Sequence, residues 1–540
     1  MTHRLGALLV ACLMATAAEA KAPKLVVFVT VDSMGSDLFS RMKPRLKGGL
    51  SQVLTQGAYF PTVRYEQAEC VTASAHATLA TGASPWRHGI VGNRMLNRAT
   101  GKLEPAFTDL THPVLEAPLG NDDVSPQALL SQTVSDQLRL ATVSKGKALA
   151  ISAKARAAIP LAGRLGEAYW FNENTGRFVT GTHYRKEFPA WVKAFNDKKP
   201  ADEYFGKSWT LLAPPAEYAG VDDRPFESDV LGLGRAFPHS LSGGGTAAGA
   251  ASYAALAATP FINDLTAQFA KAALEGEGFG KDDVPDLLNV SFSGLDRVYH
   301  VYGPYSFEAQ DALLRLDKAL TDVIAAAEKA AGGKANLTVI VTGDHGGAAL
   351  AEEWIAAGLD AARVSADALA QLIKTELLQK YKADFLLALE ETDVYLDAKA
   401  MADKKVDVRE VRRAVASVLS RHPRVAVAVS RDDLATESAQ GFGESLRKGF
   451  HPDRSGDVVL LLKPFAVLDS EGSGTTHGTP YAYDAEVPFL LWGKSVKPGV
   501  YLSALRAVDI ASTLAAILEI GNPAHAEGAA CTEALTLSPK

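Results

Sequence analysis

Four runs of apolar and β-branched residues along the chain have the length of strands. The runs are residues 25–31, 287–292, 337–341 and 487–492. Asp32, Asp296 and Asp344 follow the first three runs within a few residues. An almost continuous apolar run predicts a strand that is buried on both faces, which is typical of a parallel sheet covered by helices. We therefore expect a mostly parallel central sheet.

Helical periodicity lies between these runs. Residues 261–274 and residues 309–327 both place apolar side chains on one face at spacings of three and four. The alternation of strands and helices predicts the α/β class. Two stretches interrupt it and are expected to be inserts over the core, namely residues 150–255, rich in Gly, Pro and aromatic residues, and residues 350–470.

The inserts divide the predicted core into three parts, residues 21–149, 256–349 and 471–540. Within the second insert, Asp407 is expected to cap a helix, and residues 425–429 and 458–462 are expected to be strands. We therefore predict that the second insert is a small α+β unit.

The first 20 residues are expected to be a signal peptide that is not part of the fold. They combine a basic start at His3 and Arg4, an apolar stretch too short to span a bilayer, and an A-x-A cleavage pattern at residues 18–20. We therefore expect the mature protein to be periplasmic or secreted, without stable membrane insertion.

Composition and charge narrow the classes of partner. The chain has 540 residues and a net charge of -7, with 47% hydrophobic and 22% charged residues, which is ordinary globular usage. A mildly acidic chain does not attract a polyphosphate backbone, so no nucleic acid is expected as a dedicated partner. Cys70 and Cys531 either pair or remain two buried thiols, and the sequence leaves this open. The oligomeric state is open as well, with a monomer as the working expectation.

Three Asp and three His form a candidate metal site. They are Asp32, Asp296, His300, Asp344, His345 and His477. Ligands of α/β sheets bind at the carboxyl ends of strands, where the aspartates are expected. His300 lies one helical turn after Asp296, and His477 lies in a glycine-rich loop. Each residue alone has an ordinary alternative as a helix cap, surface pair, turn or loop residue. Together, oxygen and imidazole ligands without thiolate favour catalytic zinc.

A nucleophile is expected in the hydroxyl-rich segment of residues 69–78. Thr72, Ser74 and Thr78 are all candidates, and their spacing does not choose between them. A hydroxyl at the start of a helix lies beside free backbone N–H groups, which suits a phosphate oxyanion. The alternative for each hydroxyl is helix capping or a place in the core.

Several short motifs, in this order along the chain, resemble the alkaline phosphatase superfamily. They are T-V-D-S-M at residues 30–34, V-T-A-S-A-H at 71–76, H-G-I-V-G-N at 88–93, S-G-L-D at 293–296 with His300, and T-G-D-H-G at 342–346. The likeness is closest to the PafA-type alkaline phosphatases, which neighbour the nucleotide pyrophosphatase/phosphodiesterases. It implies an alkaline-phosphatase-like α/β core with inserted cap subdomains.

The resemblance also implies two Zn²⁺ ions per subunit and a role for each motif residue. One zinc would be held by Asp296, His300 and His477, and the other by Asp32, Asp344 and His345 with the oxygen of Thr72. Thr72 has the position of the family nucleophile, and Asn93 matches the asparagine that holds a phosphoryl oxygen. Ala75 stands where many relatives carry glycine, a small change that does little to this assignment.

Lys154 and Arg156 form a Lys-x-Arg pair at the expected entry of the first insert. Alone, such a pair is usually two solvent-exposed cations. Because it follows the other motifs in family order, it resembles the phosphate clamp of PafA-type monoesterases. Arginine offers phosphate a planar fork of donors, and lysine offers a compact charge.

The expected function is an exported, zinc-dependent alkaline phosphatase that acts on small-molecule phosphate monoesters through a phosphothreonine on Thr72. The alternatives are a type I phosphodiesterase or nucleotide pyrophosphatase and, less favoured, a phosphate- or metal-binding protein without turnover. A sulfatase is disfavoured because the segment around Cys70 lacks the Pro and Arg of the C/S-x-P-x-R motif.

Overall fold

A computed structural model describes residues 22–98, 100–116, 124–434, 441–469 and 472–536. The predicted signal peptide, residues 1–20, lies outside these ranges. Among the described residues, no helix combines the length and the apolar character needed to cross a bilayer.

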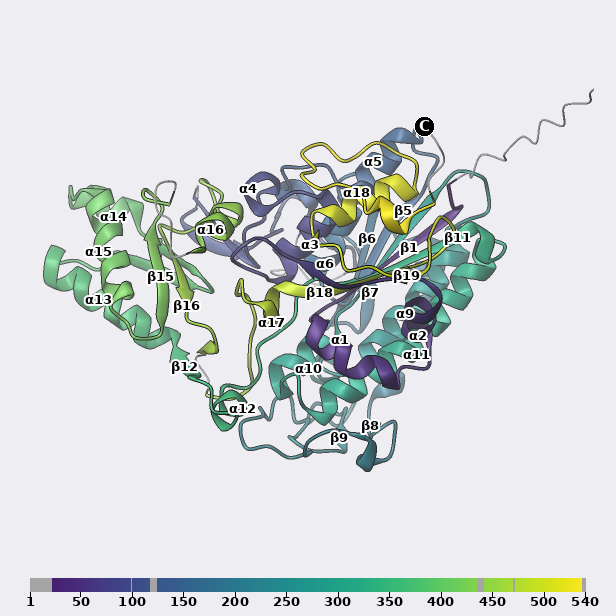
Figure 1. The fold of residues 1–540 in the computed structure, drawn as a ribbon, viewed down its shortest axis with the longest axis horizontal. Coiled ribbons are helices and arrows are strands. Elements are labelled where there is room, and N and C mark those ends of the chain that lie inside the picture. Colours follow the sequence, from purple (N-terminus) through teal and green to yellow (C-terminus); the bar gives the residue numbers. More distant parts are fainter. Residues whose placement is uncertain (1–21, 99, 117–123, 435–440, 470–471, 537–540) are drawn as a thin grey trace, which may run out of the picture.

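A large mixed sheet forms the centre of the molecule (Figure 1). Its strands, in spatial order, are β19 (Gly499–Val500), β2 (Ala58–Arg64), β18 (Glu486–Gly493), β11 (Leu337–Gly343), β1 (Leu25–Val31), β10 (Asp286–Phe292), β5 (Ala148–Ser152), β6 (Glu167–Asn172) and β7 (Arg177–Val179), with β20 (Leu505–Arg506) beside β2. The five strands from β11 to β6 run parallel. Every residue of β1, β10 and β11 is buried, because helices cover both faces. The predicted α/β class with a mostly parallel sheet is confirmed.

Strand β18 runs antiparallel to β11 and β2. The sequence predicts this strand correctly but groups it with the parallel ones. An apolar run reports burial on both faces and carries no information on direction, which explains the difference. The reversal matters for the site, because β18 begins at the edge where the parallel strands end. Thr342 near the end of β11 pairs with Phe489 near the start of β18.

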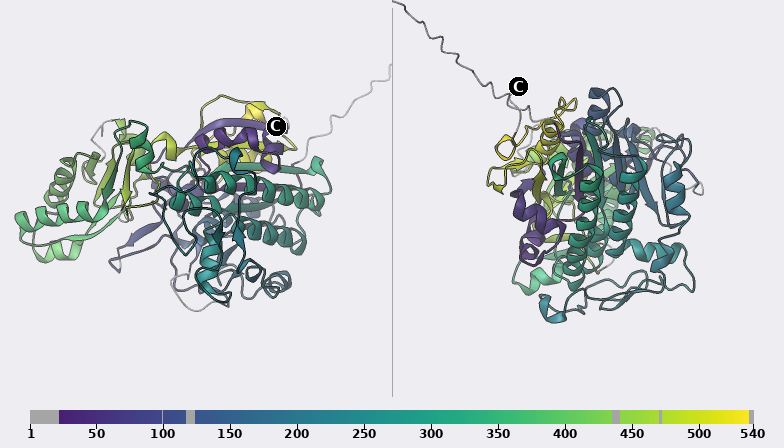
Figure 2. Two further views of the ribbon diagram at one scale, coloured as in Figure 1. Left: turned by 90° about the horizontal axis from the view of Figure 1, so that it is seen from below. Right: turned by 90° about the vertical axis from the view of Figure 1, so that its right-hand side faces the viewer.

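Helices pack on the two faces of the sheet (Figures 1 and 2). One face carries α1 (Ser36–Met42), α2 (Gly49–Gln56), α9 (Phe261–Gly276) and α11 (Phe307–Ala330). The other face carries α3 (Thr72–Thr81), α5 (Val134–Ala141), α6 (Ala155–Ala162) and α18 (Asp509–Ile517). The helices predicted for residues 261–274 and 309–327 are therefore confirmed as α9 and α11.

The first insert begins later than the sequence predicts. Strands β6 and β7, helix α6 and the end of β5 lie within residues 150–179, yet they belong to the central sheet and its cover. The aromatic residues of β6, which the sequence suggests are part of an irregular insert, are buried core residues. Irregular structure follows β7, with α7 (Ala190–Asn196), β8 (Ser208–Trp209), β9 (His239–Ser240) and α8 (Ala250–Ala257).

The second insert has its own sheet and core. Its sheet has the order β13 (Leu386–Glu390), β14 (Asp393–Leu396), β16 (Val458–Leu462) and β15 (Val425–Ser430), and α13 (Ala366–Tyr381), α14 (Ala398–Asp403), α15 (Val408–Ser420) and α16 (Gly443–Gly449) accompany it. Asp407 caps α15 by accepting hydrogen bonds from two backbone N–H groups, as predicted. Strands β12 (Ala362–Ser365) and β17 (Ala466–Asp469) pair where the chain enters and leaves this insert.

The two cysteines left open by the sequence are free, buried thiols. The Cys531 Sγ accepts a hydrogen bond from Thr513 at 3.4 Å, and the Cys70 Sγ lies 3.7 Å from the carbonyl of Gln67. Each thiol thus has a separate polar neighbour, and neither forms a disulfide.

Candidate active site

The ends of three parallel strands place the candidate carboxylates side by side. Val31, the last residue of β1, is in register with Phe292 of β10 and Gly343 of β11. Asp32 and Asp344 follow their strands directly, and Asp296 lies in the first turn of α10 (Gly294–Tyr302) after β10. The in-register strand ends therefore bring Asp32 together with Asp296 and Asp344, which lie about 260 and 310 residues further along the chain.

Two groups of three side chains have the ligand spacing of metal sites. The first group is Asp296, His300 and His477, and the second is Asp32, Asp344 and His345. Within each group, the candidate ligand atoms all lie within 4.8 Å of one another. These are the same two sets that the family resemblance implies. The imidazole rings of His345 and His477 stack with centroids 3.7 Å apart, so the two groups are immediate neighbours.

Backbone carbonyls orient all three histidines. The Nδ1 atoms of His300, His345 and His477 lie 2.9, 2.8 and 3.0 Å from the carbonyl oxygens of Thr475, Gly346 and Cys70. When neutral, a ring that donates Nδ1–H to a carbonyl presents an unprotonated Nε2 on its other side. Metal-binding histidines are typically held in this way.

Buried atoms without hydrogen-bond partners test whether a cation fits these groups. Within the described part of the chain, Asp32 Oδ1, Asp344 Oδ2, His345 Nε2 and Thr72 Oγ1 are buried and accept or donate no hydrogen bond. His345 Nε2 lies 3.4 Å from both Asp32 Oδ1 and Asp344 Oδ2, and His76 lies 3.2 Å from Asp344 Oδ2. Buried polar atoms without a hydrogen bond cost free energy, and four of them meeting in one place are unusual. Oxygen and imidazole donors fit a divalent cation such as zinc, so the residues present match the implied cofactor.

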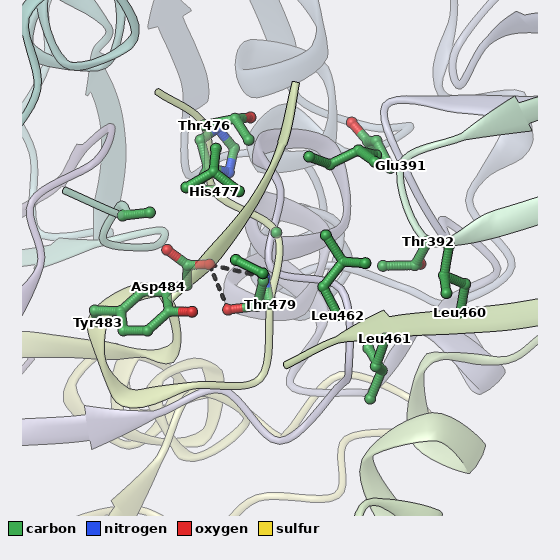
Figure 3. A pocket seen from close by; sticks show the side chains of 15 residues that line it. Glu391, Thr392, Leu460, Leu461, Leu462, Thr476, His477, Thr479, Tyr483 and Asp484 are labelled. Atoms are coloured by element: carbon green, nitrogen blue, oxygen red, sulfur yellow. Dashed lines mark hydrogen bonds between the residues drawn. The ribbon is translucent and has the colours of Figure 1, made fainter. Parts of the chain in front are cut away.

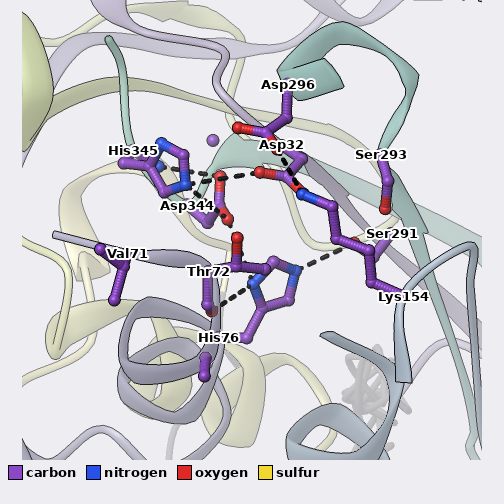
Figure 4. A network of polar contacts seen from close by, with 12 residues as sticks. Asp32, Val71, Thr72, His76, Lys154, Ser291, Ser293, Asp296, Asp344 and His345 are labelled. Atoms are coloured by element: carbon purple, nitrogen blue, oxygen red, sulfur yellow. Dashed lines mark hydrogen bonds and ion pairs between the residues drawn. The ribbon is translucent and has the colours of Figure 1, made fainter. Parts of the chain in front are cut away.

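Burial and mutual repulsion perturb the acidic groups. The pKa of Asp32 is raised to about 6 by burial and by the charges of Asp296 and Asp344. Burial also acts to raise the pKa of Asp296, but Lys154 and the neighbouring histidines hold it well below its usual value. The Lys154 ammonium lies 2.5 Å from Asp32 and also hydrogen-bonds to Asp296, so it compensates carboxylates of both ligand groups (Figure 4).

The two stacked histidines are shifted in opposite directions. Burial and the adjacent His477 lower the pKa of His345 to about 3, so its ring is neutral. Burial alone would lower the pKa of His477, but the hydrogen bond and charge of Asp296 raise it to about 9. Opposite shifts in adjacent titratable groups are typical of functional sites.

The hydroxyl partners separate the three candidate nucleophiles. Ser74 donates to the backbone carbonyls of Glu69 and Val71, and Thr78 donates to the carbonyl of Ser74. Both hydroxyls therefore already have backbone partners. Thr72 is the first residue of α3, and its buried hydroxyl has no hydrogen-bond partner among the described residues. Figure 4 shows this hydroxyl directed towards Asp344 and Asp32.

A polar cleft of about 610 Å³ opens beside these groups. Asn93, Lys154 and Arg156, the three predicted phosphate-binding residues, all line it. Lys154 and Arg156 lie where β5 leads into α6, so the pair belongs to the core and not to the entry of an insert. The Nε atom of Arg156 is buried and has no hydrogen-bond partner in the described part of the chain.

Two residues of the site were not selected from the sequence. Ser33 donates its hydroxyl to Asp296 at 2.7 Å and its backbone N–H to Asp344 at 3.1 Å, so it links the two ligand groups. His76 Nδ1 lies 3.2 Å from Asp344 and 2.9 Å from the carbonyl of Thr72. Both belong to the recognised motifs: Ser33 follows Asp32, and His76 lies one turn after Thr72. Those positions were the available signal.

A smaller cavity of about 130 Å³ lies behind the loop that carries His477 (Figure 3). Leu460, Leu461 and Leu462 of the second insert line it opposite His477. Asp484 fixes this loop by accepting hydrogen bonds from the backbone and the hydroxyl of Thr479, at 2.9 and 2.6 Å. The second insert and the candidate ligand His477 therefore line the same small cavity.

The fold and the site define a class of α/β hydrolases in which Asp and His side chains gather at the carboxyl edge of the sheet, beside a helix that begins with a hydroxyl residue. The model of the family described as type I phosphodiesterase / nucleotide pyrophosphatase matches residues 26–481. The chain belongs to this family.

Known relatives agree with this placement over almost the whole chain. Alkaline phosphatase PafA of Elizabethkingia meningoseptica is 33% identical over 95% of this chain and 94% of the relative. A Myroides odoratus protein named calcium-transporting ATPase is 33% identical over 95% of both chains. The crystal structure of wild-type PafA matches with a TM-score of 0.89 and 32% identity, over 95% of this chain and 99% of that one. The resemblance to the PafA-type alkaline phosphatases is therefore confirmed.

Proposed function

We propose that this protein is an exported, zinc-dependent alkaline phosphatase that hydrolyses small-molecule phosphate monoesters through a phosphothreonine intermediate. The name of PafA supports phosphate ester hydrolysis, and the ATPase name of the second relative describes removal of a phosphoryl group from ATP. Export to the periplasm or the medium rests on the features of residues 1–20 alone. The observation that carries the proposal is the unpaired, buried Thr72 hydroxyl beside two oxygen–imidazole groups.

The proposed cofactors are two divalent cations, most simply Zn²⁺. The ligand sets are Asp296, His300 and His477 for one cation, and Asp32, Thr72, Asp344 and His345 for the other. When bound, such a pair supplies positive charge that favours the deprotonated hydroxyl and offsets the charge that develops during in-line phosphoryl transfer. Cations at these positions would also compete with Lys154 for Asp32 and Asp296, which would free the ammonium for a phosphoryl oxygen.

Thr72 is the proposed nucleophile. Its oxygen attacks the phosphorus while the bond from phosphorus to the ester oxygen breaks, and the proton that Thr72 loses is balanced by the proton that the leaving alcohol gains. A water molecule then attacks the phosphothreonine, which restores the Thr72 hydroxyl and releases inorganic phosphate. Ser33 and His76 hold Asp296 and Asp344 in place during both steps through the contacts described above.

Asn93, Lys154 and Arg156 are proposed to bind the phosphoryl oxygens that are not reacting. A monoester dianion has one more unsubstituted oxygen than a diester. Three donors, two of them cationic, therefore favour the monoester. The family description favours the other candidate, a type I phosphodiesterase or nucleotide pyrophosphatase. That function predicts the opposite preference when a monoester and a diester are compared at equal concentration.

The experiment combines metal analysis with turnover of a chromogenic monoester. The purified protein should contain two zinc ions, lose turnover on chelation and regain it with zinc. Thr72→Ala should retain zinc but lose turnover, because the hydroxyl is removed while the Asp and His ligands of both groups remain. A metal-free active protein, or a Thr72→Ala protein with unchanged turnover, would contradict the proposal.

A further inference from the structure

A side chain of the second insert reaches the proposed phosphate-binding asparagine. Glu391 lies in the two-residue turn between β13 and β14, and its carboxylate accepts a hydrogen bond from Asn93 Nδ2 at 3.3 Å. On the other side, Asn93 Oδ1 accepts a hydrogen bond from the backbone N–H of Ala73 at 3.1 Å. The amide is therefore held from both ends, once by the helix that begins at Thr72 and once by the insert.

These two contacts determine which way the Asn93 amide points. A backbone N–H requires the amide oxygen, and a carboxylate requires the amide nitrogen, so both contacts select the same orientation. Nδ2 carries two hydrogens. One is directed to Glu391, and the other remains for a phosphoryl oxygen in the cleft that Asn93 lines.

The backbone of Asn93 is held independently of Glu391. Its carbonyl accepts a hydrogen bond from Ala106 at 2.9 Å, and the next residue starts the antiparallel pair β3 (Arg94–Asn97) and β4 (Lys102–Pro105). Loss of Glu391 should therefore release the amide without moving the chain.

The turn itself is fixed against the core. Thr392 donates its hydroxyl to Glu69 at 2.5 Å, only three residues before Thr72. Gly92 makes the approach possible, since a Cβ at this position would lie 2.6 Å from Glu69 Oε1. Glu391 has a φ of +50° at the first turn position, where hairpins of this length usually carry glycine. Glu391 thus carries a long side chain at a turn position whose backbone conformation favours glycine.

We propose that Glu391 is a positioning residue: it orients the Asn93 amide so that its second N–H meets the phosphoryl group. The inference rests on the proposed role of Asn93 in binding phosphate. It assigns to the second insert a part in phosphate recognition, through a contact between residues almost 300 positions apart.

A double-mutant cycle tests this, with kcat/KM for a monoester and inhibition by inorganic phosphate as readouts. Glu391→Ala should lower kcat/KM about fivefold and weaken phosphate inhibition in parallel, as for one lost hydrogen bond. Asn93→Ala should lower both further, and adding Glu391→Ala to it should change neither. Glu391→Gln keeps an acceptor and should recover activity to within about twofold, whereas Glu391→Asp is too short and should not.

Glu376→Ala is the matched control, because this insert glutamate pairs with Arg421 at the surface, 3.2 Å away. Its activity should equal that of the unaltered protein. An equal loss from Glu391→Ala in both backgrounds, or no loss in the unaltered protein, would overturn the inference while leaving monoester hydrolysis by Thr72 intact. An Asn93→Ala protein with full activity would overturn it too. If the unaltered protein did not hydrolyse monoesters, the proposed function itself would be overturned.

Discussion

Replacement of Arg156 by alanine tests the discrimination between monoesters and diesters most directly. Arg156 lies in the first turn of α6 and lines the polar cleft. Its Nε is buried without a hydrogen-bond partner, and no described Asp or Glu forms an ion pair with it. Lys154, by contrast, is engaged with two carboxylates. The Arg156 guanidinium therefore has its full set of donors available for a ligand.

The magnitude follows from the number of donors that a phosphoryl group can use. A guanidinium fork makes two charge-assisted hydrogen bonds, and each contributes about 1.5–3 kcal/mol. Loss of both, taken at the lower value, costs about 3 kcal/mol, which corresponds to roughly a 100-fold loss in kcat/KM. A diester has one oxygen fewer for the fork, so its loss should be about tenfold at most.

The assay compares kcat/KM for one aryl monoester and one aryl diester in Arg156→Ala, Arg156→Lys and the unaltered protein. Arg156→Lys keeps the charge but loses the fork, and it should fall between the other two. Arg421→Ala, which removes an exposed arginine of the second insert, controls for unspecific loss of positive charge. An equal loss for both substrates would refute the reasoning, because the discrimination would then not arise at Arg156.

Three further measurements address the metals, the His477 loop and the pH dependence of stability. Chelation should lower the thermal midpoint by a few degrees, because cations that bind only the folded state stabilise it by mass action; no shift would contradict metal binding. Gly474→Ala should lose both stability and zinc content, since a Cβ there would lie 2.3 Å from the His300 carbonyl, whereas Gly472→Ala shares the positive φ but meets nothing within 4 Å. If the two substitutions lowered stability and zinc content equally, the cause would be the positive φ that both positions share, and not the contact with the His300 carbonyl. Burial, opposed by Arg224, raises the pKa of Glu227 to about 7, so the folded state holds a proton there that the unfolded state has lost. Its contribution to stability should therefore fall by at most about 3 kcal/mol as the pH rises from about 4.5 through 7, and Glu227→Gln should flatten this part of the curve of unfolding free energy against pH.

The sequence points to the candidate ligands because they stand next to strong local patterns. Asp32 and Asp344 follow apolar runs, and His300 stands one helical turn after Asp296. These signals are local. The residues lie close together in space because parallel strands end at the same edge of the sheet. The choice of Thr72 as the proposed nucleophile depends on the structure or the family resemblance. The hydroxyls of Ser74 and Thr78 donate to backbone carbonyls, whereas that of Thr72 has no hydrogen-bond partner among the described residues, and the sequence does not show this difference.

The remaining features depend on contacts that leave no local pattern. The apolar run of β18 is compatible with either strand direction, and only its pairing with β11 shows that it is antiparallel. The aromatic residues of β6 are typical of a strand, but the glycine- and proline-rich sequence after them suggests an irregular insert. Only the pairing of β6 with β5 shows that it belongs to the central sheet. The approach of Glu391 to Asn93 joins two turns from different units, and neither turn is distinctive by itself.

The second insert is built into the support of the site rather than added beside it. Residues 65–93, which carry Thr72 and Asn93, contact both the central sheet, through Tyr65, and the sheet of the insert. Ala68 packs in a buried cluster with Val427 and other residues of that second sheet, and its N–H donates to Ser445. Arg454 donates to the carbonyls of Gly89 and Ala128, both at 2.6 Å. Because the same segment contacts both units, substitutions at the insert residues that touch residues 65–93 should change phosphate binding as well as stability, whereas those at its exposed surface should change neither.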